Sequence, residues 1–271
     1  MSFKKRIFHW ITRQKRTAFG KLLSRFSLGI HHALENKIND NELSGEYWVL
    51  RKLTELQLKI VFDVGANVGN WTKELKKNSP GSQVYLFEPV PETFEKLLEN
   101  LSKLEGVYPN QLALSDSEGM LEFYYYPSQS YFSSVYPSSF GKESKIKLIP
   151  STAGDNFCQK NQLSQIDLIK IDVEGFEGKV LAGFKDMIKN QKIRAIQFEY
   201  GPQAIDSKFL LRDFYDFFKE NGYRVGKIYP SWIDWSTYSS GKENFILSNF
   251  LAIQDSEKSL IELLKNEKFN N

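Results

Sequence analysis

The sequence has few of the side chains that form disulfides or bind transition metals. It contains one cysteine, Cys158, and three histidines within the first 32 residues: His9, His31 and His32. A single thiol cannot close a disulfide within the chain and excludes zinc sites that need several cysteines. We interpret Cys158 as a small buried residue in a protein of a reducing compartment, and we expect no zinc or other structural metal.

Long apolar runs are also missing. No stretch of 18 apolar residues occurs, and the first residues have neither the apolar core nor the cleavage site of a secretory signal. The chain is nevertheless 41% hydrophobic and 14% aromatic, enough for a sizeable core in 271 residues. We therefore expect a globular, cytoplasmic protein without a membrane-spanning segment.

Acidic side chains are absent from residues 1–34, which we call the arm. The arm carries eight of the 36 Lys and Arg residues, whereas all 33 Asp and Glu residues follow it. Its apolar residues recur at roughly helical spacing: Phe3, Ile7, Trp10, Ile11, Ala18, Leu22 and Phe26. A basic amphipathic helix can lie on the inner face of an anionic membrane, contact another acidic partner or pack on the body, and these alternatives stay open. We divide the chain into a basic helical extension, residues 1–45, and one domain, residues 46–271.

Apolar runs alternate with amphipathic stretches along the rest of the chain. The predicted strands lie near residues 59–64, 83–88, 107–114, 166–172, 193–199, 223–229 and 245–253. The predicted helices lie near residues 70–78, 91–103, 174–189, 207–221 and 255–271. An extra strand is expected at residues 119–126, followed by a loop up to residue 141. This order is typical of a doubly wound, mostly parallel α/β sheet covered on both faces.

The first predicted strand runs directly into a glycine-containing loop, Asp63-Val64-Gly65-Ala66-Asn67-Val68-Gly69. Ligands of open α/β sheets bind beyond the carboxyl ends of the strands, where glycine lets the backbone approach them. A dinucleotide loop has the pattern G-x-G-x-x-G, whereas positions 65, 67 and 70 are Gly, Asn and Asn. The carboxylate of Asp63 would repel a pyrophosphate but suits the ammonium group of a methionine moiety. We therefore expect S-adenosylmethionine at Asp63, Gly65, Ala66, Asn67 and Gly69.

The next two strand ends complete the expected cofactor site. Glu88, 23 positions after Gly65 and followed by Pro89, can accept hydrogen bonds from both ribose hydroxyls. After the third strand, Leu114 can contact adenine, and Ser115 and Asp116 can bind its polar edge. The same Ser-Asp pair could instead form a turn before the following strand.

The fourth and fifth strand ends gather ionisable groups. Lys170, Asp172 and Glu174 alternate along a strand and share one side, and Glu199 ends the next strand. Clustered acids repel one another unless they share a cation, a proton or a substrate. Alternatively, Lys170 pairs with Asp172 while Glu174 and Glu177 cap the following helix. We predict Asp172 as the general base, Glu174 or Glu199 as its substitute and Lys170 as an electrostatic tuner, and we leave open a role of the carboxylates in holding the acceptor or a magnesium ion.

Taken together, these motifs resemble the FkbM family of S-adenosylmethionine-dependent methyltransferases over roughly residues 58–254. The resemblance rests on residues 62–69, 87–91 with Asn100, 113–116, 167–175 with Glu177, and 197–199. It implies a class I methyltransferase sheet of seven strands with a reversed last hairpin. It also implies methylation of a hydroxyl on a sugar, glycan or secondary metabolite. One departure is Gly154, because the family usually has an apolar residue before the acid at position 155.

Three other function classes remain to be compared. An NAD-dependent oxidoreductase would need the missing glycines, and a nucleic-acid methyltransferase would show an Asn-Pro-Pro-aromatic strand end, so we expect no nucleic acid. A non-catalytic adenosyl-binding protein would not need the acid cluster. The acceptor is not identified, because the aromatic side chains of residues 123–140 could stack on sugar faces or pack as a flap. They are Tyr124, Tyr125, Tyr126, Tyr131, Phe132 and Tyr136.

Overall fold

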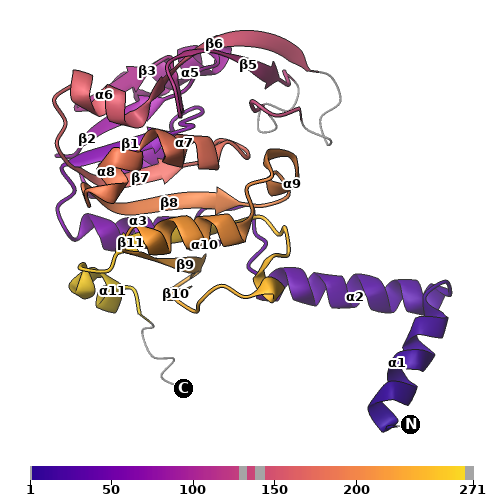
Figure 1. Ribbon diagram of the computed structural model, residues 1–271. Helices are drawn as coiled ribbons and strands as arrows, with labels where there is room; N and C mark the ends of the chain where they lie inside the picture. The colour runs from indigo at the N-terminus through magenta and orange to yellow at the C-terminus, as the bar shows by residue number, and fades with distance from the viewer. Residues whose placement is uncertain (1, 128–132, 138–143, 266–271) are drawn as a thin grey trace.

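An eight-stranded sheet forms the centre of the computed structural model, which describes residues 2–127, 133–137 and 144–265 (Figure 1). Its strands are, in spatial order, β10 (Trp232–Asp234), β9 (Tyr223–Tyr229), β11 (Ser248–Gln254), β8 (Ile193–Tyr200), β7 (Ile166–Ile171), β1 (Ile60–Val64), β2 (Gln83–Phe87) and β3 (Val107–Asn110). β1 and β7 lie inside the sheet, and they are mostly apolar and almost fully buried, as is typical of parallel strands covered by helices on both faces.

The direction of the strands confirms the predicted fold class. β3, β2, β1, β7 and β8 pair in parallel, whereas β11 is antiparallel to both β8 and β9. This is the expected mostly parallel sheet with a reversed last hairpin. The expected number of seven strands is exceeded by one, because the short strand β10 pairs with β9 at the edge.

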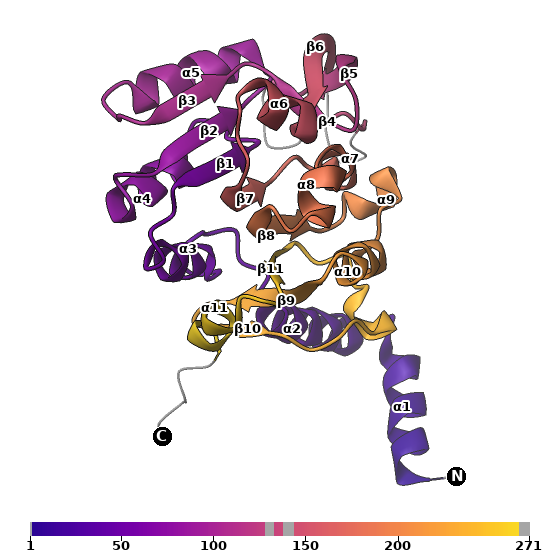
Figure 2. The same ribbon diagram turned by 60° about the vertical axis from the view of Figure 1, so that its left-hand side comes forward.

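Helices cover both faces of the sheet, and each face has its own apolar core (Figure 2). One face is covered by α3 (Glu46–Thr54), α4 (Asn70–Asn78), α5 (Pro91–Leu101) and α11 (Lys258–Leu263). The other is covered by α6 (Gly154–Lys160), α7 (Glu177–Gly183), α8 (Lys185–Lys189) and α10 (Leu211–Glu220). Two short elements, α9 (Ala204–Ser207) and the 3-10 helix η2 (Ser240–Lys242), lie in the loops after β8 and β10.

The one helix predicted at residues 174–189 is two helices that meet at Phe184. Phe184 is fully buried and packs so close to Gly154 that a β-carbon there would lie 2.4 Å from its ring. This contact explains the family departure at Gly154. The carboxylate of Asp155 accepts hydrogen bonds from the backbone N–H groups of Asp186 and Met187 at the start of α8. Asp155 therefore lies at the amino end of α8.

A second, three-stranded sheet lies beside the carboxyl end of β2. It consists of β4 (Ala113–Ser115), β6 (Lys145–Ala153) and β5 (Gly119–Tyr125). The strand predicted at residues 107–114 is thus divided between two sheets, and β6 was not predicted. β5 confirms the expected extra strand. Of the aromatic loop, Tyr131 and Phe132 lie outside the described residues.

The arm is helical, as predicted, and projects from the body (Figure 1). It consists of α1 (Phe3–Gln14) and α2 (Ala18–Leu34), and the hydroxyl of Thr17 caps α2 by accepting the N–H of Gly20 at 3.0 Å. No helix among the described residues is long and apolar enough to cross a bilayer. The division of the chain at residue 45 stays a prediction, since Asn36 and Ser44 are already buried against the body.

Candidate active site

A pocket of about 380 Å³ lies at the carboxyl edge of the main sheet. Residues at the ends of β1, β2, β7 and β8 line one part of it, and side chains of β4, β5 and β6 line another. The parallel strands bring their carboxyl ends to the same edge, so residues more than 130 positions apart in the sequence meet here. This is the position that the strand-end motifs predicted.

The loop after β1 needs glycine at position 65 for two reasons. Gly65 has φ of 80°, and a β-carbon on it would lie 1.8 Å from the carbonyl oxygen of Asp172. The N–H groups of Gly65 and Ala66 both donate to the carbonyl oxygen of Phe87 at 3.0 Å. The loop is therefore held directly against the ends of β2 and β7.

Glu88 is held by the backbone on both carboxylate oxygens. The N–H of Asn67 donates to Oε2 at 3.1 Å, and the N–H of Val90 donates to Oε1 at 2.9 Å. The side chain lines the pocket but is only 7% exposed. Burial raises the pKa of Glu88 to about 7, against the opposing effect of the two N–H donors. Each oxygen retains a lone pair, so the carboxylate can accept two further hydrogen bonds.

Three carboxylates that follow or end β7 and β8 meet in the pocket. One oxygen each of Asp172, Glu174 and Glu199 lies within 4.8 Å of the other two. Asp172 accepts a hydrogen bond from the ammonium of Lys170 at 2.9 Å, and Glu174 accepts one from the amide of Gln203 at 2.5 Å. The three oxygens can share a proton, bind donor groups of a substrate or coordinate a divalent cation.

Burial keeps two of these acids protonated up to higher pH. It raises the pKa of Glu174 to about 8, with a further contribution from the charge of Asp172. Burial also raises the pKa of Glu199 well above its usual value, again reinforced by Asp172. Glu174 has φ of 54°, a left-handed conformation that is uncommon outside glycine and is concentrated at functional sites.

Lys170 lies beneath the pocket in a buried group of acids. Burial by itself would lower the pKa of Lys170, but the carboxylates of Asp172, Glu46 and Asp63 raise it above its ordinary value. Glu46, the first residue of α3, was not predicted, because a lone acid at a helix start is no motif. Burial raises its pKa to about 7. Lys170 therefore remains charged and orients Asp172.

The predicted site residues fall into two groups. Those that line the pocket are Gly65, Asn67, Glu88, Pro89, Leu114, Asp172, Glu174 and Glu199. Those that do not line it are Asp63, Ala66, Gly69, Ser115, Asp116 and Lys170. The structure also brings in pocket-lining residues that the sequence did not indicate, among them Asn39, Gln203 and Leu247.

Asp63 and Asp116 lie away from the pocket for different reasons. Asp63 is fully buried beneath the loop and accepts the hydroxyl of Thr72 at 2.6 Å, which joins β1 to α4. Asp116 forms a 2.6 Å ion pair with Lys179 at the surface. Glu177, the first residue of α7, accepts the N–H groups of Val173 and Gly175 and so holds the preceding loop. It does not cap α7, which has no side-chain cap.

The sequence matches a known family over more than half of its length. The profile described as the methyltransferase FkbM domain matches residues 63–225. A hexuronic acid methyltransferase, AglP of Haloferax volcanii, is 30% identical over 175 residues, which are 64% of this chain and 70% of that protein. The 2-O-methyltransferase NoeI of Sinorhizobium fredii is 26% identical over 159 residues, 54% of this chain and 65% of that protein. Among solved structures, precorrin-6y C5,15-methyltransferase of Geobacter metallireducens aligns with a TM-score of 0.41 and 13% identity, covering 77% of this chain and 88% of that one.

Proposed function

Because the chain belongs to the FkbM methyltransferase family, we propose that it transfers a methyl group from S-adenosylmethionine to a hydroxyl of a sugar-containing acceptor. The observation that carries this proposal is the arrangement of the pocket. A buried carboxylate with free acceptor capacity, Glu88, faces one part of it, and three interacting carboxylates face another.

The residues of the first part fit the adenosyl group. Glu88 would accept hydrogen bonds from the two ribose hydroxyls, and the apolar side chains of Val90 and Leu114 would contact adenine. The loop from Gly65 to Asn67 would hold the methionine end. Asp63 would act from below as a positioning residue through Thr72, in place of the direct contact with the ammonium group that the sequence suggested. When bound, the cofactor supplies an electrophilic methyl group.

Asp172 is the residue best placed to remove the proton of the acceptor hydroxyl. It lines the pocket, its carboxylate is about one third exposed, and the ammonium of Lys170 fixes its orientation at 2.9 Å. Asp172 would take the hydroxyl proton while the acceptor oxygen forms its bond to the methyl carbon and the methyl–sulfur bond of the donor breaks, leaving a neutral thioether. Glu174, whose pKa is raised to about 8, would donate a hydrogen bond to a neighbouring acceptor oxygen, and the raised pKa of Glu199 favours the same role for it.

The class of acceptor is supported by the relatives and by the shape of the pocket. Two relatives are described as a hexuronic acid methyltransferase and a 2-O-methyltransferase. Tyr125 also lines the pocket, and an aromatic ring can pack on the apolar face of a sugar. No divalent metal is required by this arrangement, because Lys170 already provides a cation at the cluster.

Transfer of a labelled methyl group to a panel of glycans tests the proposal. We expect labelled product from sugar-containing acceptors, and we expect the label to resist mild alkali, which cleaves methyl esters but not ethers. Calorimetric titration with S-adenosylmethionine, S-adenosylhomocysteine and NAD is the companion experiment. Binding of NAD in place of both adenosyl compounds would overturn the proposal, and alkali-labile label would move the reaction to a carboxylate.

A further inference from the structure

The arm exposes apolar faces that the body does not cover. Among its described residues only Gly20 is buried. Phe3 is 80% exposed, and Leu22 and Phe26 are each 67% exposed. Helices of globular proteins normally bury their apolar side, so two uncovered helices of this kind indicate a partner.

Most of the exposed apolar side chains form a stripe on each helix, and Phe8 and Leu28 lie outside these stripes. On α1 they are spaced by three or four positions: Phe3, Ile7, Trp10 and Ile11. On α2 they follow the same spacing: Phe19, Leu22, Phe26, Ile30 and Leu34. The two stripes meet where the chain bends, because the rings of Trp10 and Phe19 lie 5.9 Å apart.

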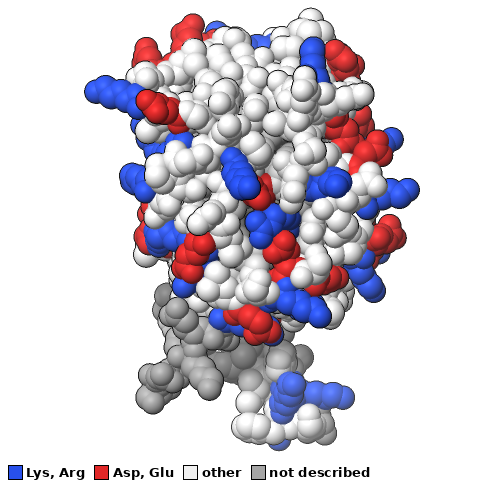
Figure 3. Space-filling model, turned by 90° about the vertical axis from the view of Figure 1, so that its left-hand side faces the viewer, with Lys and Arg blue, Asp and Glu red and all other residues white. Residues whose placement is uncertain are grey.

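The charge of the arm indicates what kind of surface it contacts. Eight Lys and Arg residues and no acid accompany the apolar stripes, whereas the face of the body at the amino ends of the strands carries both signs interspersed (Figure 3). A nucleic acid or an acidic protein would match the charge but not the row of large apolar side chains. An anionic phospholipid surface matches both, because its headgroups attract the cations while the interface accepts the apolar residues.

The arm is fastened to the body and does not hang from a free linker. Glu35, directly after α2, forms a 2.6 Å ion pair with Lys227 of β9, whose side chain is 8% exposed. The amide of Asn36, also buried, donates to the carbonyl oxygens of Ser44 and Ile228 at 2.7 and 3.1 Å. These contacts fix the direction in which α2 leaves the body.

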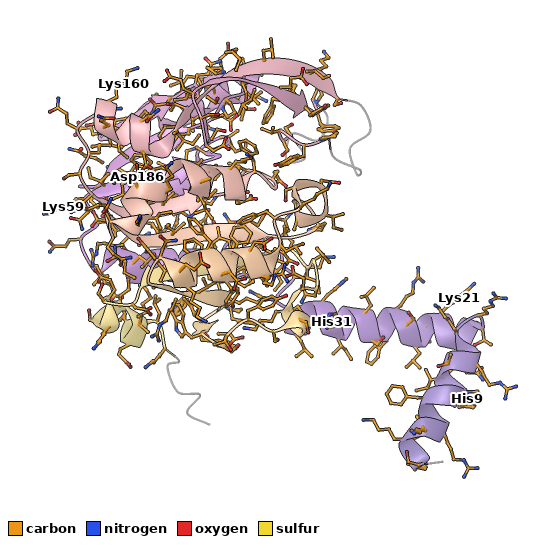
Figure 4. The ribbon with its side chains drawn as sticks, in the orientation of Figure 1. His9, Lys21, His31, Lys59, Lys160 and Asp186 are labelled. Atoms are coloured by element: carbon orange, nitrogen blue, oxygen red, sulfur yellow. The ribbon has the colours of Figure 1, made fainter. Side chains whose placement is uncertain are left out.

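The arm leaves the body on the side where the pocket lies. Asn39, four positions after the fastening ion pair, lines the pocket. Figure 4 shows Lys59, which precedes β1 at the amino edge of the sheet, at the opposite end of the body from His31 and the arm. The carboxyl edge and the arm therefore lie on the same side of the molecule.

We propose that the arm docks on an anionic phospholipid membrane and thereby brings the pocket-bearing edge of the sheet to the bilayer, where the acceptor is a glycan carried by a membrane lipid. The docking step stands on the arm alone. The class of acceptor rests in addition on the proposed methyl transfer.

Co-sedimentation of the full chain with vesicles tests the docking step. We expect pelleting with vesicles of phosphatidylcholine and phosphatidylglycerol, and little with phosphatidylcholine alone. The paired change Leu22→Ser and Phe26→Ser keeps the charge and should weaken binding about tenfold or more. Lys21→Gln and Arg25→Gln should each weaken it about fivefold. Ser24→Ala, three positions after Lys21 on the polar side of α2, is the matched control.

Two outcomes would overturn docking. One is equal, negligible pelleting of the unmodified chain with both vesicle types. The other is a stable dimer that becomes monomeric in the Leu22→Ser, Phe26→Ser variant, which would make a second copy the partner of the stripes. Gel-shift binding of RNA without vesicle binding would assign the arm to nucleic acid and equally reject the proposal.

The class of acceptor is tested by offering the same glycan in two forms, free in solution and attached to a lipid in anionic vesicles. We expect the Leu22→Ser, Phe26→Ser variant to lose at least tenfold in kcat/KM for the lipid-attached glycan and to match the unmodified protein with the free glycan. Equal activity of both proteins on both forms would overturn this step. If the protein binds the vesicles but methylates neither form of the glycan, the proposed function is rejected while membrane docking is retained.

Discussion

The two sides of the pocket hold their carboxylates in opposite ways. Glu88 receives a backbone N–H on each oxygen, so its position is fixed before any ligand arrives. Asp172, Glu174 and Glu199 instead face one another, with Lys170 and Gln203 as their partners. The first arrangement suits the binding of neutral hydroxyl groups, whereas the second suits a proton that changes place during a reaction.

The backbone shows why both arrangements can coexist at one edge. Gly65 brings the β1 loop so close to the carbonyl of Asp172 that the two sides are in direct contact. Asn67 and Glu174, one from each side, both have left-handed backbone conformations. The strand ends thus supply rigid neighbours, and the difference in chemistry comes from the donors that reach each carboxylate.

The largest expected effect comes from Asp172→Asn, which removes the charge on the proton-accepting side and keeps the volume. Loss of a general base typically lowers turnover by about 10²–10⁴-fold, and kcat should fall by this much. Affinity for S-adenosylmethionine should change less, because Glu88 is untouched. The measurement is kcat with a methylated glycan and calorimetric affinity for the cofactor. Asp216→Asn, on the exposed side of α10, is the control, and near-normal turnover in Asp172→Asn would move the base to Glu174 or Glu199.

Glu88→Ala tests the proposed cofactor-binding part of the pocket. Loss of charge-assisted hydrogen bonds to the ribose should weaken cofactor binding by about 1.5–3 kcal/mol, or roughly 10- to 150-fold. At saturating cofactor, kcat should fall far less than in Asp172→Asn. Calorimetric titration measures the change, and Glu92→Ala, which removes an exposed acid paired with Lys147, serves as the control. An unchanged affinity would place the ribose contact elsewhere.

The raised pKa of Glu174 should make the free energy of unfolding depend on pH. The folded state holds the proton of Glu174 up to a pKa of about 8, whereas the unfolded chain releases it near 4.5. Between these values the folded state binds more protons, so the free energy of unfolding should fall as pH rises, by up to about 1.4 kcal/mol per pH unit for this group. Glu174→Gln should reduce that slope.

Denaturant unfolding over a series of pH values provides the measurement for this prediction. Glu88 and Glu177, whose pKa values are each raised to about 7 by burial, contribute in the same direction, so some slope should remain in Glu174→Gln. Glu122→Gln changes an exposed acid of β5 and should leave the slope as it is. A slope identical in Glu174→Gln and the unmodified protein would contradict the assignment of the raised pKa to Glu174.

The sequence predicts the strands of the main sheet best where they are fully buried. β1 and β7 are mostly apolar and almost fully buried, and Gly65 and Asp172, which follow them, line the pocket. β6 was missed because it contains Pro150 and exposes much of one face, both of which weaken a strand pattern. The break at Phe184 was missed because helical spacing continues through it and only packing against Gly154 interrupts it.

In the site too, positions at strand ends can be predicted from the sequence, whereas features that depend on packing cannot. Glu88 and Glu174 follow strands, so their place at the edge can be predicted from topology. Glu46 begins a helix outside every motif, and it joins the buried acids around Lys170 only through the packing of α3 under the sheet. Asp63 was expected in the pocket because it ends β1, yet its side chain points to Thr72 on the helix side. The strand position was predictable, whereas the direction of the side chain depended on the neighbouring helix.

The smallest expected effect concerns the contact between the acid side and the segment after β5. The hydroxyl of Ser134 donates to the carbonyl oxygen of Glu174 at 2.7 Å, and the backbone of Ser134 pairs with that of Tyr124. Ser134→Ala should cost about 0.5–1.5 kcal/mol in the free energy of unfolding, the usual worth of one hydrogen bond. It loosens the left-handed residue that orients the Glu174 carboxylate, so the KM for the acceptor should rise a few-fold while kcat and cofactor affinity hold. Ser102→Ala removes a similar but exposed hydrogen bond, to Glu99, and should leave the KM for the acceptor and the cofactor affinity unchanged. If Ser134→Ala weakened cofactor binding as much as acceptor binding, the two sides of the pocket would have to be treated as one coupled unit.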